Sequence, residues 1–596
     1  MPVVDLTVDR NLLCPNFDGY KLSFDAVPVL RQGFDRDPLK LEPHLNQYSL
    51  LHVELFAKHN LLFSDPWARH NSYYMNTAHQ LVLCSYDEQH GQPRAQRVVY
   101  TMRREDHGDG YQHLVGDYNY TLRFISEKYC VVCDGMLTFH LLETGDRMRD
   151  TSWQLVTRSP VTNDMQQRGF VLYDARLDMV QERKQISLIA GHVRRREAAA
   201  PHQADVHVMQ LIWSRWTLDS QPEASWSYKL CEQLETPGSI YYCAFEPRAD
   251  SLVVCSNGQL QTLAQLKAEA EQAAAAATAA EAQLNHDNEP SYSWTQTEQD
   301  VIVRFPLRSG ATRDEFNISC TPRQALVKRR EETLLQGVLY ADVEDELTSW
   351  TVEGQTLQLT LVKQRQEQWP RLLQTEHVVV EAVKEEQPAE QPAEPEDDSE
   401  MDIEPEPERL PIPNLEDPIE ECDFPLGNSD DDIKMVRFNL STSGITHTIF
   451  MGAIPPLFAT SLRAGYPAAF VTRQGVDASV WLQLYQPAKP GEWSVRHEGN
   501  LHAFGYVQAS KQQRKFIDCC PQLDYAVISE SYRHVFIYKP RYDSAGGLRN
   551  RNGPQVVIGK QNLVTLDDDL GEVLGLVTAT NVITVLTEHA VLYLQV

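Results

Sequence analysis

The sequence predicts an all-β protein in which two strand-rich flanks enclose a small antiparallel β-sandwich. Apolar segments of strand length recur along both flanks, and hardly any segment between them has the periodicity of an amphipathic helix. Between the flanks, residues 292–373 hold several alternating strands and three tryptophans. Many short strands joined by turns are typical of sandwiches and propellers.

The central sandwich is predicted from the period-2 pattern of its strands. Within 357–361 the three leucines share one face, while Gln358 and Thr360 share the other. Val301, Val303 and Phe305 show the same alternation. About eighty residues of this kind, without helix-length periodicity, favour a sandwich spanning 289–378.

In the flanks, a hairpin-like pattern recurs: an apolar strand, a short polar turn, then a second apolar strand. It is present at 129–139, 252–260, 525–538 and 581–594. The first two contain Asp-Gly and Asn-Gly, which tight hairpins favour. We therefore expect each of these four segments to form a β-hairpin.

The flanks, 1–257 and 436–596, are expected to form the N-terminal and C-terminal parts of one β-propeller-like domain. Together they suffice for about seven or eight blades. An apolar strand that runs to Val596 would suit ring closure by pairing of the two terminal strands. The Trp-Asp dipeptide of WD repeats is absent, so the blades would be degenerate. Two smaller β-domains are the alternative.

Two low-complexity segments flank the sandwich. The alanine runs within 258–288 predict a helical spacer, because alanine loses the least free energy on helix formation. The segment 379–435 is rich in Pro, Glu and Asp and is expected to be a disordered acidic linker. In it, Ser399 and Ser429 precede acidic residues, the context that casein-type kinases accept, so both are candidate phosphorylation sites.

The charge is unevenly placed. The net charge is −29, and 21 acidic against two basic residues between Glu381 and Asp432 account for −19 of it. Phosphate binding needs clustered Lys and Arg, so we expect no direct nucleic-acid partner. No apolar run approaches the roughly 18 residues of a membrane span, and the first residues lack a signal-peptide pattern. We therefore expect no membrane association.

No motif marks a catalytic, metal or cofactor site. Cys130 and Cys133 form a CxxC pattern, but in a strand residues three apart point to opposite faces. No second pair has the spacing of a zinc site, so core thiols are the better interpretation. Walker, GxSxG, HExxH and dinucleotide motifs are absent, and we expect neither an enzyme nor a bound cofactor.

The order and spacing of the sandwich residues resemble the CS domain of the NudC family. The residues that carry this resemblance are Tyr292, Trp294, Gln296, Gly337, Leu339, Tyr340, Trp350, Lys363, Trp369 and Pro370. We expect them to be mainly structural, with the tryptophans in the core or sealing its edges. Partner contact would then fall on exposed faces.

The resemblance to the NudC family extends into both flanks, at 17–23, 500–511 and 533–538. It implies a non-enzymatic co-chaperone in cytoplasm and nucleus that binds a chaperone of the ninety-kilodalton heat-shock class, β-propeller clients, or both. The dimerising coiled coil of NudC is not visible, so a monomer is expected. The alternative is a scaffold subunit of a motor, vesicle coat or RNA-helicase assembly, in which the CS domain is only a docking face.

Overall fold

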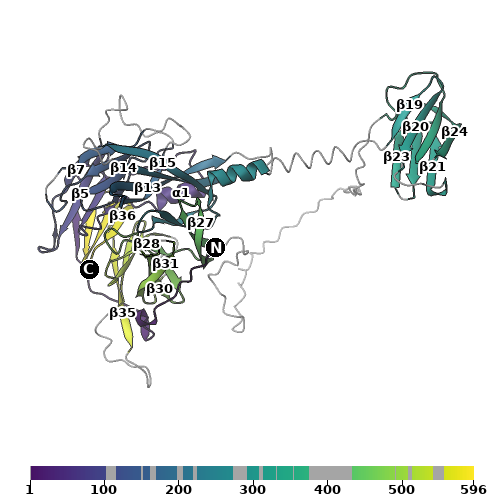
Figure 1. Cartoon of the computed structure of the whole chain (residues 1–596). Coiled ribbons are helices and arrows are strands. Elements are labelled where there is room, and N and C mark those ends of the chain that lie inside the picture. Colours follow the sequence, from purple (N-terminus) through teal and green to yellow (C-terminus); the bar gives the residue numbers. More distant parts are fainter. Residues whose placement is uncertain are drawn as a thin grey trace, which may run out of the picture. The chain divides into compact units, whose positions relative to one another are not determined.

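The computed structural model describes residues 2–102, 116–149, 152–160, 169–196, 206–218, 225–272, 292–307, 313–330, 332–353, 355–374, 433–486, 488–489, 491–505, 507, 513–540 and 556–596. Its chain divides into two compact units, one formed by 1–266 with 416–596 and the other by 267–415. Strands dominate both (Figure 1). The all-β fold class is confirmed.

Seven sheets, numbered here in chain order, form the larger unit. The first contains β3 (Phe63–Ser64), β4 (Asn71–Met75), β5 (Gln80–Asp87), β6 (Gln92–Pro93) and β7 (Arg97–Thr101). The second contains β8 (Thr121–Phe124), β9 (Tyr129–Cys133), β10 (Phe139–Glu143) and β11 (Gln154–Arg158). The third contains β12 (Val171–Val180), β13 (Arg183–Arg196), β14 (Val206–Leu218), β15 (Trp226–Thr236) and β18 (Gln261–Thr262).

The remaining four sheets use strands of the C-terminal flank, and three of them also include strands of the N-terminal flank. The fourth contains β16 (Ile240–Phe245), β17 (Ser251–Ser256), β26 (Ile433–Asn439) and β27 (Gly444–Gly452). The fifth contains β28 (Phe458–Thr460), β29 (Ala469–Gln474), β30 (Asp477–Tyr485) and β31 (Trp493–Leu501). The sixth contains β32 (Arg514–Cys519), β33 (Ala526–Glu530), β34 (His534–Lys539), β35 (Val557–Thr565) and β1 (Phe17–Leu22). The seventh contains β36 (Val573–Thr578), β37 (Val582–Thr587), β38 (Val591–Gln595) and β2 (Val29–Gln32).

The seven sheets close into a ring. One buried apolar cluster joins each sheet to the next, from the first to the seventh, and a further cluster joins the seventh back to the first. In that last cluster Leu62 and Tyr74 pack with Leu586 and Tyr593. A ring of four- and five-stranded sheets packed face to face is the arrangement of a β-propeller-like domain, in which each sheet buries both faces.

Pairing between the flanks completes three of the sheets. β2 pairs with β38 in antiparallel register, with Val29 opposite Leu594. β1 lies parallel to β35, and β17 pairs with β26 across the sandwich insertion. This pairing covers strand edges that would otherwise present unpaired backbone groups.

The hairpin predicted at 252–260 is wrong. β17 ends at Ser256 and pairs with β16 and β26, so its next neighbour in the sheet comes from beyond the sandwich. Asn257 and Gly258 instead turn the chain out of the sheet, and a Cβ on Gly258 would lie 2.5 Å from the backbone nitrogen of Gly238. An Asn-Gly pair therefore marks a close backbone approach here. The other three predicted hairpins are confirmed.

Short helices accompany the strands. α1 (Leu50–Ala57) begins after Ser49, whose hydroxyl accepts the amide hydrogen of His52 as an N-cap. Residues 263–272 are also helical, in the segment where alanine runs predict a spacer. The 3-10 turns are η1 (Arg10–Leu12), η3 (Arg313–Glu315) and η4 (Asp568–Leu570). Among the described residues, no helix is both long and apolar enough for a membrane crossing.

The smaller unit contains the predicted sandwich. One sheet holds β19 (Ser293–Gln296), β20 (Asp300–Pro306), β25 (Thr356–Lys363) and β24 (Val343–Glu353). The other holds β21 (Phe316–Thr321), β22 (Gln324–Arg329) and β23 (Glu332–Val338). The leucines of β25 are fully buried while the residues between them are half-buried, which confirms the predicted alternation. They pack with Val301, Val303 and Phe305 in one core.

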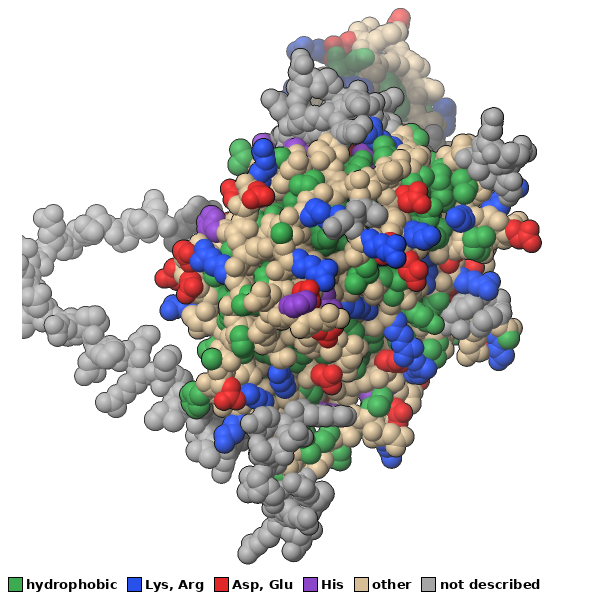
Figure 2. Space-filling view, turned by 90° about the vertical axis from the view of Figure 1, so that its left-hand side faces the viewer, with side chains coloured by type: hydrophobic (Ala, Val, Ile, Leu, Met, Phe, Trp, Pro, Cys, Tyr) green, Lys and Arg blue, Asp and Glu red, His purple; other side chains and the backbone are tan. Residues whose placement is uncertain are grey.

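The surface of the described residues carries both signs of charge. Figure 2 shows Lys and Arg side chains interspersed with Asp and Glu side chains and with apolar ones. This mixture agrees with the sequence, in which the segment 381–432 accounts for most of the net negative charge.

Candidate protein-binding surfaces

Lys363 is a buried cation that ties together the end of the sandwich. Only 6% of its surface is exposed. Its ammonium donates to Oε1 of Gln296 at 2.8 Å and to the carbonyl oxygens of Thr297 at 2.9 Å and Glu367 at 2.7 Å. All three donors of the ammonium are thus used. Burial lowers its pKa, since a desolvated ammonium is less stable than a hydrated one.

Gln296 connects this lysine to the buried tryptophan of the motif. Its Oε1 also accepts the backbone N–H of Trp369 at 2.8 Å, and its Nε2 donates to the Trp369 carbonyl at 2.7 Å. The side-chain amide therefore pairs with a backbone as a neighbouring strand would. Trp369, 2% exposed, is held in the sandwich core by this pairing.

The segment after β25 also packs against the end of β23. A Cβ on Gly337 would lie 2.8 Å from Cδ1 of Leu373, so the close contact depends on glycine. Leu339 is fully buried and forms a β-bridge with Leu373, and the Tyr340 amide donates to the carbonyl of Leu372. These motif residues hold the segment after β25 against the sandwich.

The other two tryptophans of the motif are half-buried at the margins of the core. The Trp350 ring lies 6.4 Å, between centroids, from Phe316, and the Arg313 guanidinium carbon lies 4.7 Å from its centroid. Trp294 packs against the same core. Both positions suit residues that seal a sandwich edge.

The remaining predicted site residues fall into two groups. The Tyr292 ring packs against Phe305, with 5.7 Å between centroids, and Pro370 is exposed beside the buried Trp369. Ser399 and Ser429, the candidate phosphorylation sites, lie outside the described residues.

An exposed bulge interrupts the edge strand β24. The pairing register with β25 shifts between Glu344 and Ser349. Asp345 and Glu346 are exposed within the bulge, and Leu347 is 59% exposed beside them. A bulge on an edge strand prevents uncontrolled strand pairing, and this one also presents an apolar side chain between acidic ones.

The cysteines of the CxxC pattern lie on opposite faces of β9, as predicted. Cys130 packs between the first and second sheets, whereas Cys133 packs between the second and third. Burial raises the pKa of the Cys133 thiol well above its usual value, which makes thiolate chemistry unfavourable there. Among the described residues, no group of three or more His, Cys, Asp or Glu side chains could hold a metal ion.

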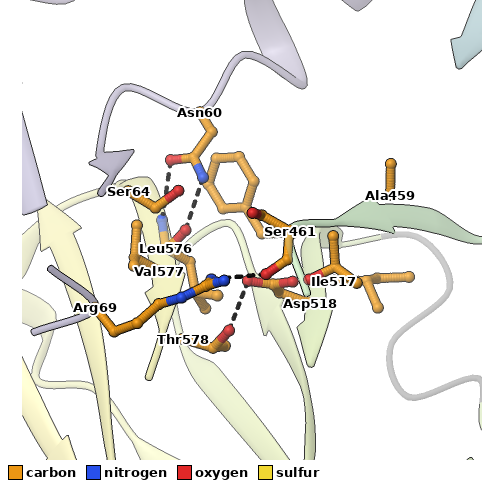
Figure 3. Close-up of a pocket in the computed structure, with 12 residues that line it drawn as sticks. Asn60, Ser64, Arg69, Ala459, Ser461, Ile517, Asp518, Leu576, Val577 and Thr578 are labelled. Carbon is orange, nitrogen blue, oxygen red and sulfur yellow. Dashed lines mark hydrogen bonds between the residues drawn. The ribbon is translucent and has the colours of Figure 1, made fainter. Parts of the chain in front are cut away.

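A small polar pocket of about 160 Å³ lies among the first strands of several ring sheets (Figure 3). Arg69 donates to the carbonyl of Ser461 at 2.6 Å. Thr578 Oγ1 donates to Asp518 Oδ2 at 2.9 Å, and Asn60 pairs with both backbone groups of Leu576. These bonds join the first sheet to the fifth and seventh and the sixth to the seventh. Burial raises the pKa of Asp518 to about 6.

The pocket residues are used by the fold. Arg69 and Asp518 each satisfy polar backbone or side-chain groups of neighbouring sheets, as buried polar groups must. No sequence motif indicates them, because they lie far apart in the chain and meet only when the ring closes.

Comparison with known proteins supports the resemblance drawn from the motif residues. Residues 290–363 match the CS domain family. The NudC domain-containing protein 1 of Xenopus tropicalis is 25% identical over 575 residues, covering 94% of this chain and 93% of its own length. That of Mus musculus is 24% identical over 570 residues, with the same shares covered.

One solved structure, a nuclear movement protein from E. cuniculi, is 25% identical over 14% of this chain and 98% of its own, with a TM-score of 0.13. The sequence matches cover both flanks as well as the sandwich. Residues 290–363 match the CS domain, and the resemblance of the chain to the NudC family is confirmed through similarity to NudC domain-containing protein 1 along almost its whole length.

Proposed function

We propose that this chain is a non-enzymatic co-chaperone that binds folding clients or chaperone complexes through its CS domain and its ring of sheets. Its partners would be a chaperone of the ninety-kilodalton heat-shock class, β-propeller clients, or both. One observation carries the proposal: the motif residues Gln296, Lys363 and Trp369 are turned inward, and Gln296 is bonded to both of the others. The sandwich is thereby a rigid support whose exposed edges are available to another protein.

The bulge of β24 is the part of the sandwich best suited to that contact. Leu347 is 59% exposed. Covering an exposed apolar side chain with a partner surface stabilises the complex, because apolar surface is removed from water. Asp345 and Glu346 beside it favour a partner with basic groups around an apolar patch. An unfolding client exposes apolar segments, and a chaperone surface can present both features.

Suppression of aggregation tests the proposal. The full chain is added to a heat-unfolded model client, and light scattering is followed over time. We expect the wild type to delay aggregation and Leu347→Asp to lose much of that effect. Phe24→Asp is the matched control, because Phe24 is 94% exposed and lies outside the sandwich.

The scaffold alternative gives a different result. A docking subunit would leave client aggregation unchanged, yet would still retain partners when the full chain is purified from cells. Affinity purification of the full chain beside a version lacking 289–378 identifies those partners. Recovery of an assembly without chaperones or folding clients, together with no delay of aggregation, would replace the co-chaperone proposal.

The proposed role places the protein in cytoplasm and nucleus, where clients and chaperones of these classes are folded. The support is the family resemblance alone. Imaging of the tagged full chain in cells tests this placement, and exclusion from both compartments would contradict it.

A further inference from the structure

An arginine-lined groove lies between the third, fourth and fifth sheets of the ring. Its volume is about 600 Å³, within the range of sites that bind small molecules or short peptide segments. It borders the turns that join the first and second strands of the fourth and fifth sheets. The lining residues are Arg176, Asp178, Pro247, Arg248, Arg463, Gly465, Tyr466, Leu482, Gln483, Leu484 and Arg496. These eleven residues are called the arginine groove below.

Arg176 fixes the shape of the arginine groove. Its Nε donates to the Pro247 carbonyl at 2.8 Å, and its guanidinium also donates to the Gly465 carbonyl. One side chain of the third sheet thus holds a turn of the fourth sheet and a turn of the fifth. A groove with walls held in this way loses little conformational entropy on binding.

Arg463 and Arg496 give the groove an excess of positive charge. Both contact the same carboxylate, Glu498, and each of these arginine side chains is 49% exposed. Glu498 itself is 15% exposed. A guanidinium has five N–H donors, so one shared carboxylate uses only part of their capacity. The fork of N–H groups suits further carboxylate ligands.

The net charge of all ionisable residues counted around the groove is also positive. Four arginines line the groove against Asp178, and Glu498 adds a second carboxylate behind them. The resulting excess of two positive charges stands in a chain whose net charge is −29. Low-dielectric walls concentrate such a field inside a cleft. Tyr466, 50% exposed, and Leu484 add an apolar side to the groove.

Asp178 distinguishes a peptide from a nucleic acid as the occupant. Its side chain is 14% exposed in the groove, and its Oδ1 lies 4.0 Å from Nε of Arg176. Burial raises its pKa to about 6, with Arg176 acting in the opposite direction. The exposed part of this carboxyl group accepts hydrogen bonds, which the backbone N–H groups of an extended peptide donate. Nucleic-acid phosphates are acceptors only and would lie against this carboxyl group.

We propose that the arginine groove docks an acidic peptide segment of another protein, with carboxylates on Arg463 and Arg496, an apolar side chain on Tyr466 and a backbone N–H on Asp178. This proposal concerns the ring and does not depend on the function proposed for the sandwich.

The acidic segment of this chain joins the ring at one end of β26, and deletion of 381–432 in the test below measures whether that segment competes with another chain for the groove. Residues 381–432 carry a net charge of −19 and lead into β26 at Ile433. At this end of β26, Lys434 pairs with Ser256 of β17. At the other end, Asn439 pairs with Ser251, and the groove borders the turn that precedes Ser251. The strand separates the two positions by seven residues, roughly 20 Å.

The test measures selection of peptides by the full chain. A pool of nine-residue peptides, each with Asp or Glu at most positions and one aromatic residue, is compared at low ionic strength with a pool in which Asn and Gln replace the acids. We expect at least about tenfold preference for the acidic pool, falling steeply with added salt. Arg463→Gln combined with Arg496→Gln should abolish most of this preference.

Two further variants keep the test interpretable. Arg94→Gln is the matched control, because Arg94 is an exposed arginine, paired with Asp87, in the turn between strands of the first sheet. It should bind as the wild type does. Arg248→Gln removes an exposed arginine of the groove on the turn of the fourth sheet and should weaken binding several-fold. Thermal unfolding of each variant shows whether the ring is intact.

Four outcomes would overturn the proposal. The first is equal binding of the acidic and amide pools. The second is retained preference in both Arg463→Gln/Arg496→Gln and Arg248→Gln. The third is an increase of tenfold or more in peptide binding on deletion of 381–432, which would make the chain's own acidic segment the occupant. Stronger binding of an oligouridylate than of any acidic peptide would likewise assign the groove to RNA.

Discussion

The Lys363 ammonium lies 2.8 Å from the Gln296 side-chain oxygen, which also accepts the backbone N–H of Trp369. One oxygen thus joins β25, which holds Lys363, to β19, which holds Gln296, and to the segment after β25, which holds Trp369. Gln296 and Lys363 are polar residues of the motif, and both serve as internal supports of the sandwich.

Gln296→Ala should destabilise the sandwich by about 2 to 4 kcal/mol, because it leaves the buried Lys363 one acceptor short and the Trp369 backbone unpaired. Urea unfolding followed by tryptophan fluorescence measures the loss. Gln364→Ala is the control, since Gln364 is exposed on the same chain segment. Equal stability of the two variants would show that the network contributes little.

Gly337→Ala should cost about 1 to 3 kcal/mol, because its Cβ would lie 2.8 Å from Leu373 Cδ1. Leu373→Ala alone should cost about 2 to 5 kcal/mol by leaving a cavity. In the double variant the clash is removed, so the combined loss should be smaller than the sum of the two. Strict additivity would mean that the two residues do not share the contact.

The tryptophans of the sandwich should differ in their effect on stability. Trp369 is 2% exposed, and Trp369→Ala should cost about 3 to 5 kcal/mol. Trp350 is half-buried under Arg313, so Trp350→Ala should cost only about 1 to 2 kcal/mol, in proportion to the area that it buries. Thermal unfolding of both variants gives the order, and a larger loss for Trp350 would contradict this assignment.

How well the sequence predicts a feature of this fold depends on how far apart in the chain the interacting residues lie. Alternation within a strand is local, so the buried leucines of β25 and the opposite faces of Cys130 and Cys133 follow from the residues alone. The partner of β17 does not, because β26 lies beyond the whole sandwich. Likewise, Arg176 and Arg463 meet in one groove only because the ring places the third and fifth sheets on either side of the fourth.

Lys363 shows a second limit of sequence reading. A lysine that ends an alternating strand is most often solvated. Here its three acceptors come from Gln296 and from two backbone carbonyls, and backbone acceptors leave no signal in the sequence. The family motif identified the residue, but only the folded geometry gives its structural role.

A buried ion pair of the ring, Arg147 with Asp65, should be far more important for stability than an exposed one. Arg147 and Asp65 are 3% and 0% exposed in their side chains and lie 2.6 Å apart, between Nε and Oδ2. Arg147→Met should cost about 3 to 5 kcal/mol, because Asp65 would remain buried without its cation. Arg94→Met breaks the exposed pair with Asp87 and should cost about 1 kcal/mol or less. Chemical unfolding of the ring compares the two, and similar losses would refute the distinction.

The final prediction concerns the pH dependence of ring stability at Asp518. Burial raises the pKa of this carboxyl group from 3.8 to about 6, so the folded ring binds its proton more tightly than the unfolded chain does. Its stabilising contribution is therefore complete below about pH 4 and is lost as the pH rises through 6.

Asp518→Asn keeps an acceptor for the Cys519 amide, and the Thr578 hydroxyl can reorient toward the new amide group. The stability of wild type minus that of Asp518→Asn should fall by about 2 to 3 kcal/mol between pH 4 and pH 7, on the order of one kcal/mol per unit of pKa shift. Unfolding midpoints of both proteins across this range measure the difference, and a constant or rising difference would show that Asp518 is ionised in the folded ring throughout.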